Sequence, residues 1–227
     1  MFFREKYNIN LFFCKFAKNK TVKQKTMIRI IGGEKSGFVI KSPQKIRPIL
    51  ARIKKSVFDI IKLRIVDSLF LDLYAGSGAV GLESLSRGAK FCFFVEKNSK
   101  CVSTLYENIK HLQYEEKSFV VRADILKDLF WIDKARKVVS RYDKKNFDII
   151  FIGAPYFEKV FDENFSQKRK LLNLCSDTVK LIYNSELLRK EGLLIVQHSI
   201  KESVDFYNFK HLKTEEYSDT IVDFLTL

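Results

Sequence analysis

The stretch Leu69-Phe-Leu-Asp-Leu-Tyr-Ala-Gly-Ser-Gly-Ala-Val-Gly81 decides how the rest of the chain is interpreted. Its first half is a short apolar run typical of a buried strand, and its second half consists of small residues that lead into a helical pattern. Gly76, Gly78 and Gly81 fit the spacing G-x-G-x-x-G, which allows backbone to approach a nucleotide at the start of a helix. The stretch therefore predicts a strand, a tight loop and a helix, in that order.

An acidic residue follows at the distance expected of a ribose-binding group. The next apolar run, residues 91–95, ends at Glu96, where a carboxylate accepts hydrogen bonds from ribose hydroxyls in nucleotide-binding βαβ units. A cluster of turn glycines and a surface glutamate would explain the same letters. The order strand, loop, helix, strand, acid favours a ligand that carries adenosine.

Asp72 discriminates between classes of ligand. A dinucleotide places its pyrophosphate over such a loop, and a nearby carboxylate would repel it. An acid four residues before the first glycine instead favours a ligand with a cation, and S-adenosylmethionine has a sulfonium and an amino group but no phosphate. The run Asp72–Gly78 looks like the cofactor loop of a class I methyltransferase.

The composition indicates a soluble α/β protein with a polyanionic partner. The chain has 227 residues, of which 46% are hydrophobic, and its 41 Lys and Arg against 27 Asp and Glu give a formal charge of +14. This excess favours RNA or DNA as partner, although a lysine-rich surface from a compositionally biased genome would also produce it. The four cysteines are scattered and predict neither a disulfide framework nor a metal site, so we expect a reducing cytoplasm.

Residues 1–26 differ from the remainder, because they hold seven basic residues and one acidic residue. We interpret them as a flexible basic extension, which is either an upstream translation-start extension or a tail that touches RNA. Residues 27–227 are expected to form a single domain. Within it, residues 27–65 read as a hairpin and a helix that face RNA, and residues 66–227 read as a Rossmann-like core.

The hairpin is predicted from two β-prone runs around a Gly/Lys/Ser turn in residues 27–43, and the helix from apolar residues at helical spacing between Ile49 and Leu63. Lys54 is expected on a solvent-facing side of this helix. A basic hairpin and helix upstream of the loop would form an edge that faces phosphates. The candidate RNA contacts are Arg29, Lys35, Arg47 and Arg52, each of which would equally suit a solvated surface.

The rest of the chain continues the alternation of strands and helices. Strands are expected at 91–95, 118–122, 146–152 and 193–198, the last after a turn at Glu191-Gly192, and two final strands around the stretch 213–216. Asn98 is expected to cap a helix that ends at His111. Asp124, at the end of a strand, could accept a hydrogen bond from the adenine amino group or cap a helix that begins at Ile125, where Phe130 and Trp131 would pack on the sheet.

A second motif, Gly153-Ala-Pro-Tyr156, directly follows the strand at 146–152. A proline-aromatic turn at the end of a central strand can present carbonyl acceptors and a stacking ring to a planar base. This turn is the predicted catalytic element.

With these two motifs in order, the sequence resembles the RsmD-like family of 16S ribosomal RNA guanine-N2 methyltransferases. The motifs that carry the resemblance are Arg29-Ile-Ile-Gly-Gly33, Arg47-Pro48, Asp72-Leu-Tyr-Ala-Gly-Ser-Gly-Ala-Val-Gly-Leu-Glu-Ser-Leu-Ser-Arg-Gly-Ala89, Val95-Glu96 and Gly153-Ala-Pro-Tyr156. The resemblance implies a Rossmann-like class I methyltransferase fold with a mostly parallel seven-stranded sheet. It also implies S-adenosylmethionine as cofactor, no metal, a monomer in the cytoplasm, and 16S rRNA or an assembling small subunit as partner.

Carried over residue by residue, the resemblance assigns cofactor binding to Asp72, Tyr74, Ala75, Gly76, Ser77, Gly78, Glu96, Lys97, Asp124 and Ile125, and catalysis to Gly153, Ala154, Pro155 and Tyr156. The family's turn reads Asp-Pro-Pro-Tyr or Asp-Pro-Pro-Phe, so Gly153 lacks a side-chain acceptor. Loss of one positioned polar group costs on the order of 10²–10³ in rate. A weakened or inactive RNA-binding assembly protein is therefore the alternative function.

Two further classes of enzyme fit less well. An amino-methyltransferase that acts on DNA would need a target-recognition domain, which the chain has little room for. A nicotinamide-dependent dehydrogenase conflicts with the acid at position 72.

Overall fold

The computed structural model describes residues 28–43, 49–155 and 174–227. Two short antiparallel strands, β1 (Ile28–Arg29) and β2 (Val39–Ile40), form a hairpin. The main sheet has seven strands in the order β5-β4-β3-β6-β7-β9-β8. Their bounds are β3 Leu69–Leu73, β4 Phe91–Glu96, β5 Ser118–Arg122, β6 Phe147–Ile152, β7 Leu188–Ser199, β8 Lys210–Tyr217 and β9 Thr220–Thr226.

The first five strands of this order are parallel to one another, and β9 pairs antiparallel with both of its neighbours, β7 and β8. The sheet is therefore mostly parallel, with the Rossmann-like class I methyltransferase architecture expected from the sequence. The strand order reverses between β3 and β6, because β4 and β5 lie on one side of β3 and β6 on the other. In open α/β sheets ligands bind outside the carboxyl ends of the strands at this switch point.

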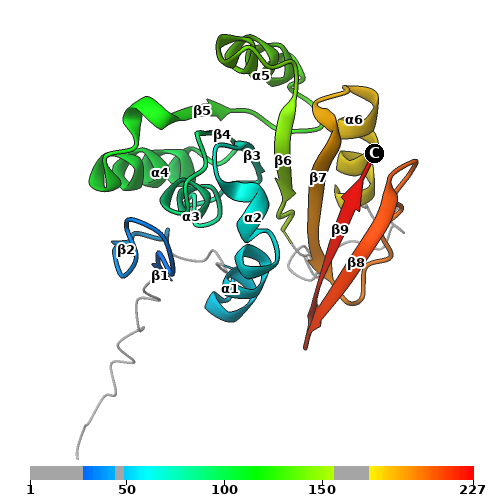
Figure 1. Cartoon of the computed structure of the whole chain (residues 1–227), viewed down its shortest axis with the longest axis horizontal. Helices are drawn as coiled ribbons and strands as arrows, with labels where there is room; N and C mark the ends of the chain where they lie inside the picture. The colour runs from blue at the N-terminus through cyan, green and yellow to red at the C-terminus, as the bar shows by residue number, and fades with distance from the viewer. Residues whose placement is uncertain (1–27, 44–48, 156–173) are drawn as a thin grey trace, which may run out of the picture.

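Helices cover both faces of the sheet (Figure 1). The hairpin, α1 (Ala51–Ile60), α2 (Lys62–Ile65), α3 (Gly81–Ser86) and α4 (Ser99–Leu112) contribute to one apolar cluster, and α5 (Phe130–Val139) and α6 (Leu174–Asn184) to the other. Successive residues of a strand point to opposite faces, so Phe70 and Phe94 join the first cluster and Leu71 and Val95 the second. The central strands are buried on both sides and read as continuous apolar runs.

Several predicted elements agree closely with the structure. The first half of the stretch 69–81 forms β3 as predicted, and the strand at 118–122 has the expected bounds. The Asn98 side chain accepts hydrogen bonds from the amides of Lys100 and Cys101 at the start of α4. The hairpin is present, and the predicted helix 49–63 is divided into α1 and α2.

Other expectations about helices were wrong. α5 begins at Phe130 rather than Ile125, because side-chain hydrogen bonds hold turns before it. The Asp128 carboxylate accepts from the Asp124 amide, and the Asp124 carboxylate accepts from the Leu126 amide. Trp131 is fully buried against the sheet, whereas Phe130 is 48% exposed. Lys54, expected to face solvent, is buried with only 1% of its surface accessible.

The last three strands also differ from expectation. The segment Glu191-Gly192 does not form a turn but lies inside β7, in a bulge between the pairs Phe147–Leu188 and Ile149–Leu193. Residues 213–216 lie within β8 rather than between strands. The predictions for residues 1–26, Arg47 and Tyr156 concern positions outside the described residues.

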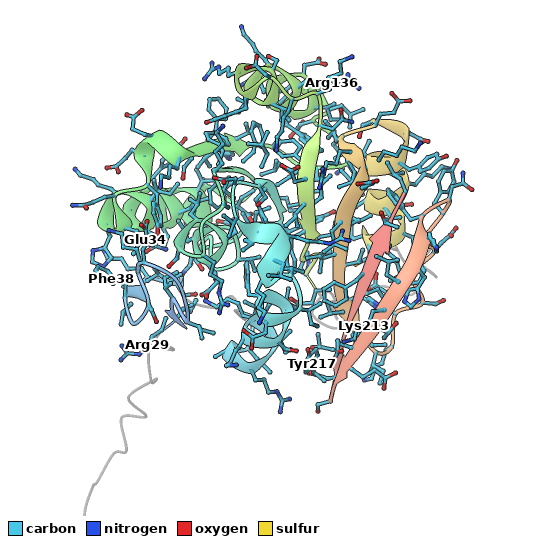
Figure 2. The ribbon with its side chains drawn as sticks, viewed as in Figure 1. Arg29, Glu34, Phe38, Arg136, Lys213 and Tyr217 are labelled. Atoms are coloured by element: carbon cyan, nitrogen blue, oxygen red, sulfur yellow. The ribbon has the colours of Figure 1, made fainter. Side chains whose placement is uncertain are left out.

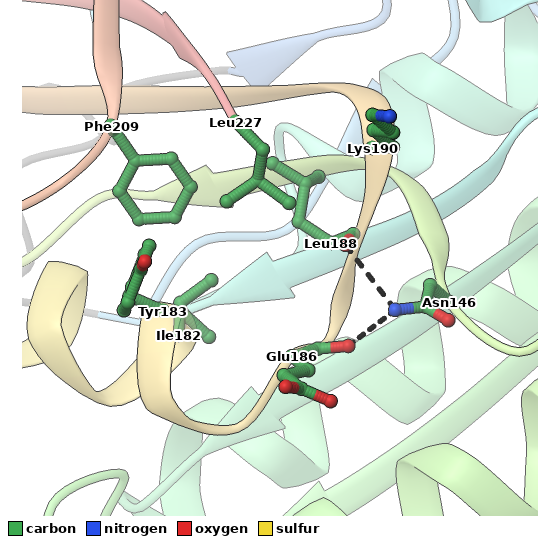
Figure 3. Close-up of a pocket in the computed structure, with 8 residues that line it drawn as sticks. All are labelled: Asn146, Ile182, Tyr183, Glu186, Leu188, Lys190, Phe209 and Leu227. Carbon is green, nitrogen blue, oxygen red and sulfur yellow. Dashed lines mark hydrogen bonds between the residues drawn. The ribbon is translucent and has the colours of Figure 1, made fainter.

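A pocket lies at the amino ends of the parallel strands β6 and β7, opposite the carboxyl ends where a ligand is expected (Figure 3). It is lined by Tyr183 and Glu186 near the end of α6, by Phe209 and by Asn146, which immediately precedes β6. The side-chain Nδ2 atom of Asn146 donates to the carbonyl of Leu188 at 3.2 Å and to that of Glu186. None of the residues predicted to bind cofactor lines this pocket.

In the described part of the chain, no helix is long and apolar enough to cross a membrane.

Candidate functional site

The loop between β3 and α3 has the backbone that its glycines predict. Gly76 and Gly78 have positive φ angles of 55° and 81°, a region that favours glycine. A Cβ at Gly78 would also lie 2.3 Å from the Leu105 Cδ1 atom, so α4 requires glycine there. A Cβ at Gly76 would meet nothing closer than the Tyr74 carbonyl at 4.0 Å, so the loop is open on that side. The open side is where a ligand can approach backbone.

Asp72 lies at the end of β3 beneath this loop and is only 2% exposed. Its Oδ2 atom accepts a hydrogen bond of 2.9 Å from the Gly81 amide, so the carboxylate fixes the start of α3. Burial raises the pKa of Asp72 to about 7, the Gly81 hydrogen bond opposes this, and the nearby Glu96 adds to it. A cation placed here would stabilise the ionised form.

Glu96 ends β4 and joins it to the glycine loop. Its Oε2 atom accepts from the Gly76 amide at 2.9 Å and its Oε1 atom from the Asn98 amide at 2.7 Å. A carboxylate has about four lone-pair positions, so each oxygen retains capacity for a ligand hydroxyl. The Ala75 amide also donates to the Val95 carbonyl at 3.1 Å, which holds the loop against the end of β4.

The residues after β5 lie beside Glu96. The Ala123 amide donates to the Glu96 carbonyl at 3.2 Å, and Asp124 Oδ2 lies 3.5 Å from the Lys97 Nζ atom. Asp124 Oδ1 accepts from the Leu126 amide at 3.3 Å, so this side chain stabilises a turn rather than the start of a helix. Ile125 is buried in the apolar cluster of α5 and α6.

The turn after β6 lies next to the loop. The Gly153 amide donates to the Leu73 carbonyl at 3.2 Å, which joins the two predicted motifs directly. Ala154 is buried and Pro155 is exposed. A Cβ at Gly153 would lie 2.9 Å from the Phe151 Cε1 atom, so any side chain at position 153 requires a small shift of that ring.

The hairpin is attached to α3 through Glu83, for which no role was predicted. Its two carboxylate oxygens accept from the amides of Ile31 and Gly32, both at 2.8 Å, from Lys54 Nζ at 2.9 Å and from Arg87 Nε at 2.7 Å. Glu83 and Lys54 are both fully buried. Burial lowers the pKa of Lys54, and the charge of Glu83 opposes this.

A second buried side chain, Asn108 of α4, connects the hairpin to the cofactor loop. Its Nδ2 atom donates to the carbonyls of Lys41 and Ser77, both at 2.9 Å, and its Oδ1 atom accepts from the Lys41 amide at 2.8 Å. The only sequence signal for Asn108 is that a polar residue occupies the apolar side of an amphipathic helix. Two polar side chains, Glu83 and Asn108, therefore fix the hairpin relative to the loop.

The described RNA candidates lie on the hairpin and on α1. Figure 2 shows Arg29 and Phe38 on the hairpin, on the other side of the molecule from Lys213 of β8. Arg29 and Arg52 are exposed, and Lys35 is partly exposed with its Nζ atom 5.7 Å from the centre of the Phe38 ring. Among the described residues, no group of three or more His, Cys, Asp and Glu could hold a metal ion.

Comparison with known proteins gives the family. The family described as "Conserved hypothetical protein 95" matches residues 28–226, and the Bacillus subtilis "Putative rRNA methyltransferase YlbH" is 31% identical over 75% of this chain and 82% of its own length. The chain belongs to the RsmD-like methyltransferase family. Its members include the "Ribosomal RNA small subunit methyltransferase D" of Escherichia coli (strain K12), which is 28% identical over 78% of this chain and 77% of its own length.

The fold of the RsmD-like family is also found among solved structures. The structure of the Thermus "hypothetical protein TTHA0928" has a TM-score of 0.66 and 26% identity, and the match covers 88% of this chain and 99% of that one. The family match begins at the hairpin and ends in the last strand. The hairpin is thus as much a part of the family as the Rossmann-like core.

Proposed function

We propose that the protein transfers a methyl group from S-adenosylmethionine to the exocyclic N2 amine of a guanine in small-subunit ribosomal RNA. The observation that carries the proposal is the open side of the loop at Gly76. The Gly76 amide donates to the buried Glu96, and the buried Asp72 holds the start of α3. The last residue of β3, just before the loop, is hydrogen-bonded to the Gly153–Pro155 turn. RNA as the substrate is supported by the names of the relatives and by the charge of +14.

The residues present fit this cofactor. Asp72 supplies negative charge below the loop for the cationic methionine portion, Glu96 has lone pairs available for the ribose, and Asp124 can accept from the adenine. Backbone at Ala75, Gly76, Ser77 and Gly78 forms the surface against which the methionine portion would lie, and Tyr74, Lys97 and Ile125 frame it. The bound sulfonium would supply an electrophilic methyl carbon.

The protein's contribution to the reaction is positioning. The lone pair of the guanine amine is delocalised into the ring, so acceptors that hold its N–H groups and aim nitrogen at the methyl carbon lower the barrier. The carbonyls of Gly153 and Ala154 are the proposed acceptors, with Pro155 shaping the turn and Tyr156 stacking on the base. In the product N2 would carry the methyl group in place of one hydrogen. The proton would pass to solvent, and the electron pair of the carbon–sulfur bond would stay on sulfur as a neutral thioether.

The partner is proposed to be 16S rRNA or an assembling small subunit, bound by a monomer in the cytoplasm. Phosphate contacts are assigned to Arg29, Lys35 and Arg52 on the hairpin side, and to Arg47. The resemblance to the RsmD-like family implies the guanine at position 966 of small-subunit RNA as the target.

The test is methylation of RNA by the purified full chain. Labelled S-adenosylmethionine and small-subunit RNA, or small subunits that lack the modification, are incubated with the protein, and modified guanines are mapped by mass spectrometry. We expect N2-methylguanine at one position. The Gly76→Ala variant should lose donor binding, because its Cβ would occupy the open side of the loop.

Substitutions at position 153 distinguish a methyltransferase from a non-enzymatic assembly protein. The second function is favoured by the absence at Gly153 of the carboxylate that the family has there. Gly153→Asp restores a carboxylate, and Gly153→Ala controls for the contact with Phe151. If wild-type protein and both variants bind RNA but transfer no methyl group, the proposed activity is wrong. If only Gly153→Asp is active, the protein is a degenerate enzyme.

A further inference from the structure

The geometry assigns a role to Thr178, a residue of α6 outside both predicted motifs. Thr178 is fully buried, and its Oγ1 atom lies 2.8 Å from the Tyr74 hydroxyl in the cofactor loop. We propose that Thr178 is a positioning residue, which holds Tyr74 and thereby the backbone of the loop in the shape that binds the methyl donor. This inference rests on the proposed function.

The direction of this hydrogen bond follows from the neighbouring contacts. The Thr178 hydroxyl donates to the Leu174 carbonyl at 2.6 Å, which uses its single hydrogen. The hydroxyl oxygen must then accept from Tyr74. Burial raises the pKa of Tyr74 to about 12, so the phenol keeps its proton at neutral pH and remains the donor.

Tyr74 needs such a restraint because of its backbone. Its φ angle is +62°, a left-handed conformation that a large side chain disfavours and that persists only where the surroundings determine it. Tyr74 lies directly between Leu73, whose carbonyl binds the Gly153 amide, and Ala75, whose amide binds the Val95 carbonyl. A shift at Tyr74 would therefore move the loop relative to both β4 and the turn after β6.

α6 is a suitable anchor for this hydrogen bond. Cys175 and Val179 on either side of Thr178 are buried in the cluster that contains Ile152 and Val196, near the carboxyl ends of β6 and β7. Tyr74 packs against the same cluster, which also includes Ala154 of the turn. The hydroxyl pair thus links the cofactor loop to a helix that is itself fixed on the sheet.

The experiment compares four variants with one control. Tyr74→Phe and Thr178→Val each remove the hydrogen bond, their combination completes a double-mutant cycle, and Thr178→Ser retains the hydroxyl. Thr104→Val is the matched control, because the Thr104 hydroxyl makes the same bond to the carbonyl four residues earlier, Lys100, at 2.9 Å. Affinity for S-adenosylhomocysteine is measured by calorimetry, and amide exchange at residues 75–78 is measured in the free protein.

We expect Tyr74→Phe and Thr178→Val each to weaken binding by about 3- to 10-fold and to speed exchange in the loop. The double variant should be no worse than either single one, and Thr178→Ser and Thr104→Val should bind as wild type does. Additive effects, or thermal destabilisation with unchanged affinity and exchange, would overturn the inference. If wild-type protein binds no S-adenosylhomocysteine, the proposed function fails, and exchange in the loop alone decides the role of Thr178.

Discussion

Asp72 accepts a hydrogen bond from Gly81 and is also proposed to face a cationic methyl donor, and these two roles differ in what they require of its charge. As the acceptor for the Gly81 amide it needs only an oxygen, which a protonated acid also provides. As the partner of a cationic methyl donor it needs a negative charge, which burial disfavours. Binding of a cation next to Asp72 should therefore be coupled to release of its proton near neutral pH.

This coupling makes Asp72 a source of pH-dependent stability. Its pKa is about 7 in the folded protein and 3.8 in the unfolded chain, so between these values the folded state holds one proton more. The free energy of unfolding then falls as pH rises through this window and levels off above pH 7. Asn at position 72 cannot ionise but keeps an oxygen for Gly81.

We predict that Asp72→Asn gains stability relative to wild type as pH rises, by about 2 kcal/mol between pH 5 and pH 7. The same variant should bind S-adenosylmethionine more weakly at pH 8, because the charge is lost. Urea unfolding of both proteins at the two pH values measures the first effect, and shifts common to other carboxyl groups cancel in the difference. A difference that does not change with pH would show that Asp72 is ionised throughout.

At the scale of elements, the attachment of the hairpin to α3 depends on a buried ion pair. Glu83 accepts from two hairpin amides and from Lys54 and Arg87. Replacement of Glu83 by Gln leaves the Lys54 ammonium buried without an opposite charge, which typically costs 3–5 kcal/mol. The hairpin amides would lose a charged acceptor at the same time.

We predict that Glu83→Gln lowers the free energy of unfolding by about 3 kcal/mol and speeds amide exchange at Ile31 and Gly32. Combining it with Lys54→Met should recover part of the loss, because no unpaired ammonium remains. Asp59→Asn is the control, since Asp59 also contacts Arg87 but is half exposed, and it should change stability by less than about 0.5 kcal/mol. Equal costs for Glu83→Gln and Asp59→Asn would rule out the buried pair as the link.

The elements that sequence reasoning predicted correctly are those specified by local signals. β3 and β5 are short apolar runs, and α4 starts at a residue whose side chain caps it. Their position in the sheet follows from alternation of strands and helices. Prediction failed where distant partners decide: β7 continues through Gly192 because β6 and β9 pair with it, and the Thr226 hydroxyl donates to the Gly192 carbonyl at 2.9 Å.

The same distinction holds in the candidate site. The glycine spacing predicted the tight backbone that the positive φ angles of Gly76 and Gly78 show. Glu96 and Gly153 were expected at the ends of neighbouring strands, and in the structure Glu96 accepts from the Gly76 amide and Gly153 donates to the Leu73 carbonyl just before the loop. Lys54 was expected to face solvent, and no role was predicted for Glu83, Asn108 and Thr178, because each looks like an ordinary polar residue of a helix. Only the tertiary fold shows that these side chains are buried and have partners 25 to 104 positions away.

At the scale of the whole molecule, the excess positive charge should govern association with RNA. Each phosphate that a cationic side chain neutralises releases counterions, so the affinity falls with salt in proportion to the number of contacts. The described candidates on the hairpin side are Arg29, Lys35 and Arg52. Lys137 is exposed on α5, the helix that packs on the other face of the sheet, and it provides a comparison.

A plot of log affinity against log salt concentration has a negative slope. We predict that replacing Arg29, Lys35 or Arg52 by Ala makes this slope less steep, by about 0.7–0.9 for each replacement. Lys137→Ala should leave the slope unchanged. Fluorescence anisotropy of a labelled small-subunit RNA fragment across a salt series measures the slopes. If Lys137→Ala has the larger effect, RNA binds over α5 and the hairpin assignment is wrong.

The antiparallel run of β9 has a practical consequence. Because β9 pairs antiparallel with β7, it begins beside Ser199 and finishes near Gly192, so Leu227 lies at the border of the sheet remote from the glycine loop. A purification handle or fluorophore joined after Leu227 would leave the molecule there. Immobilised through this end, the protein would present its glycine loop, the proposed methyl-donor site, freely to large ribonucleoprotein particles.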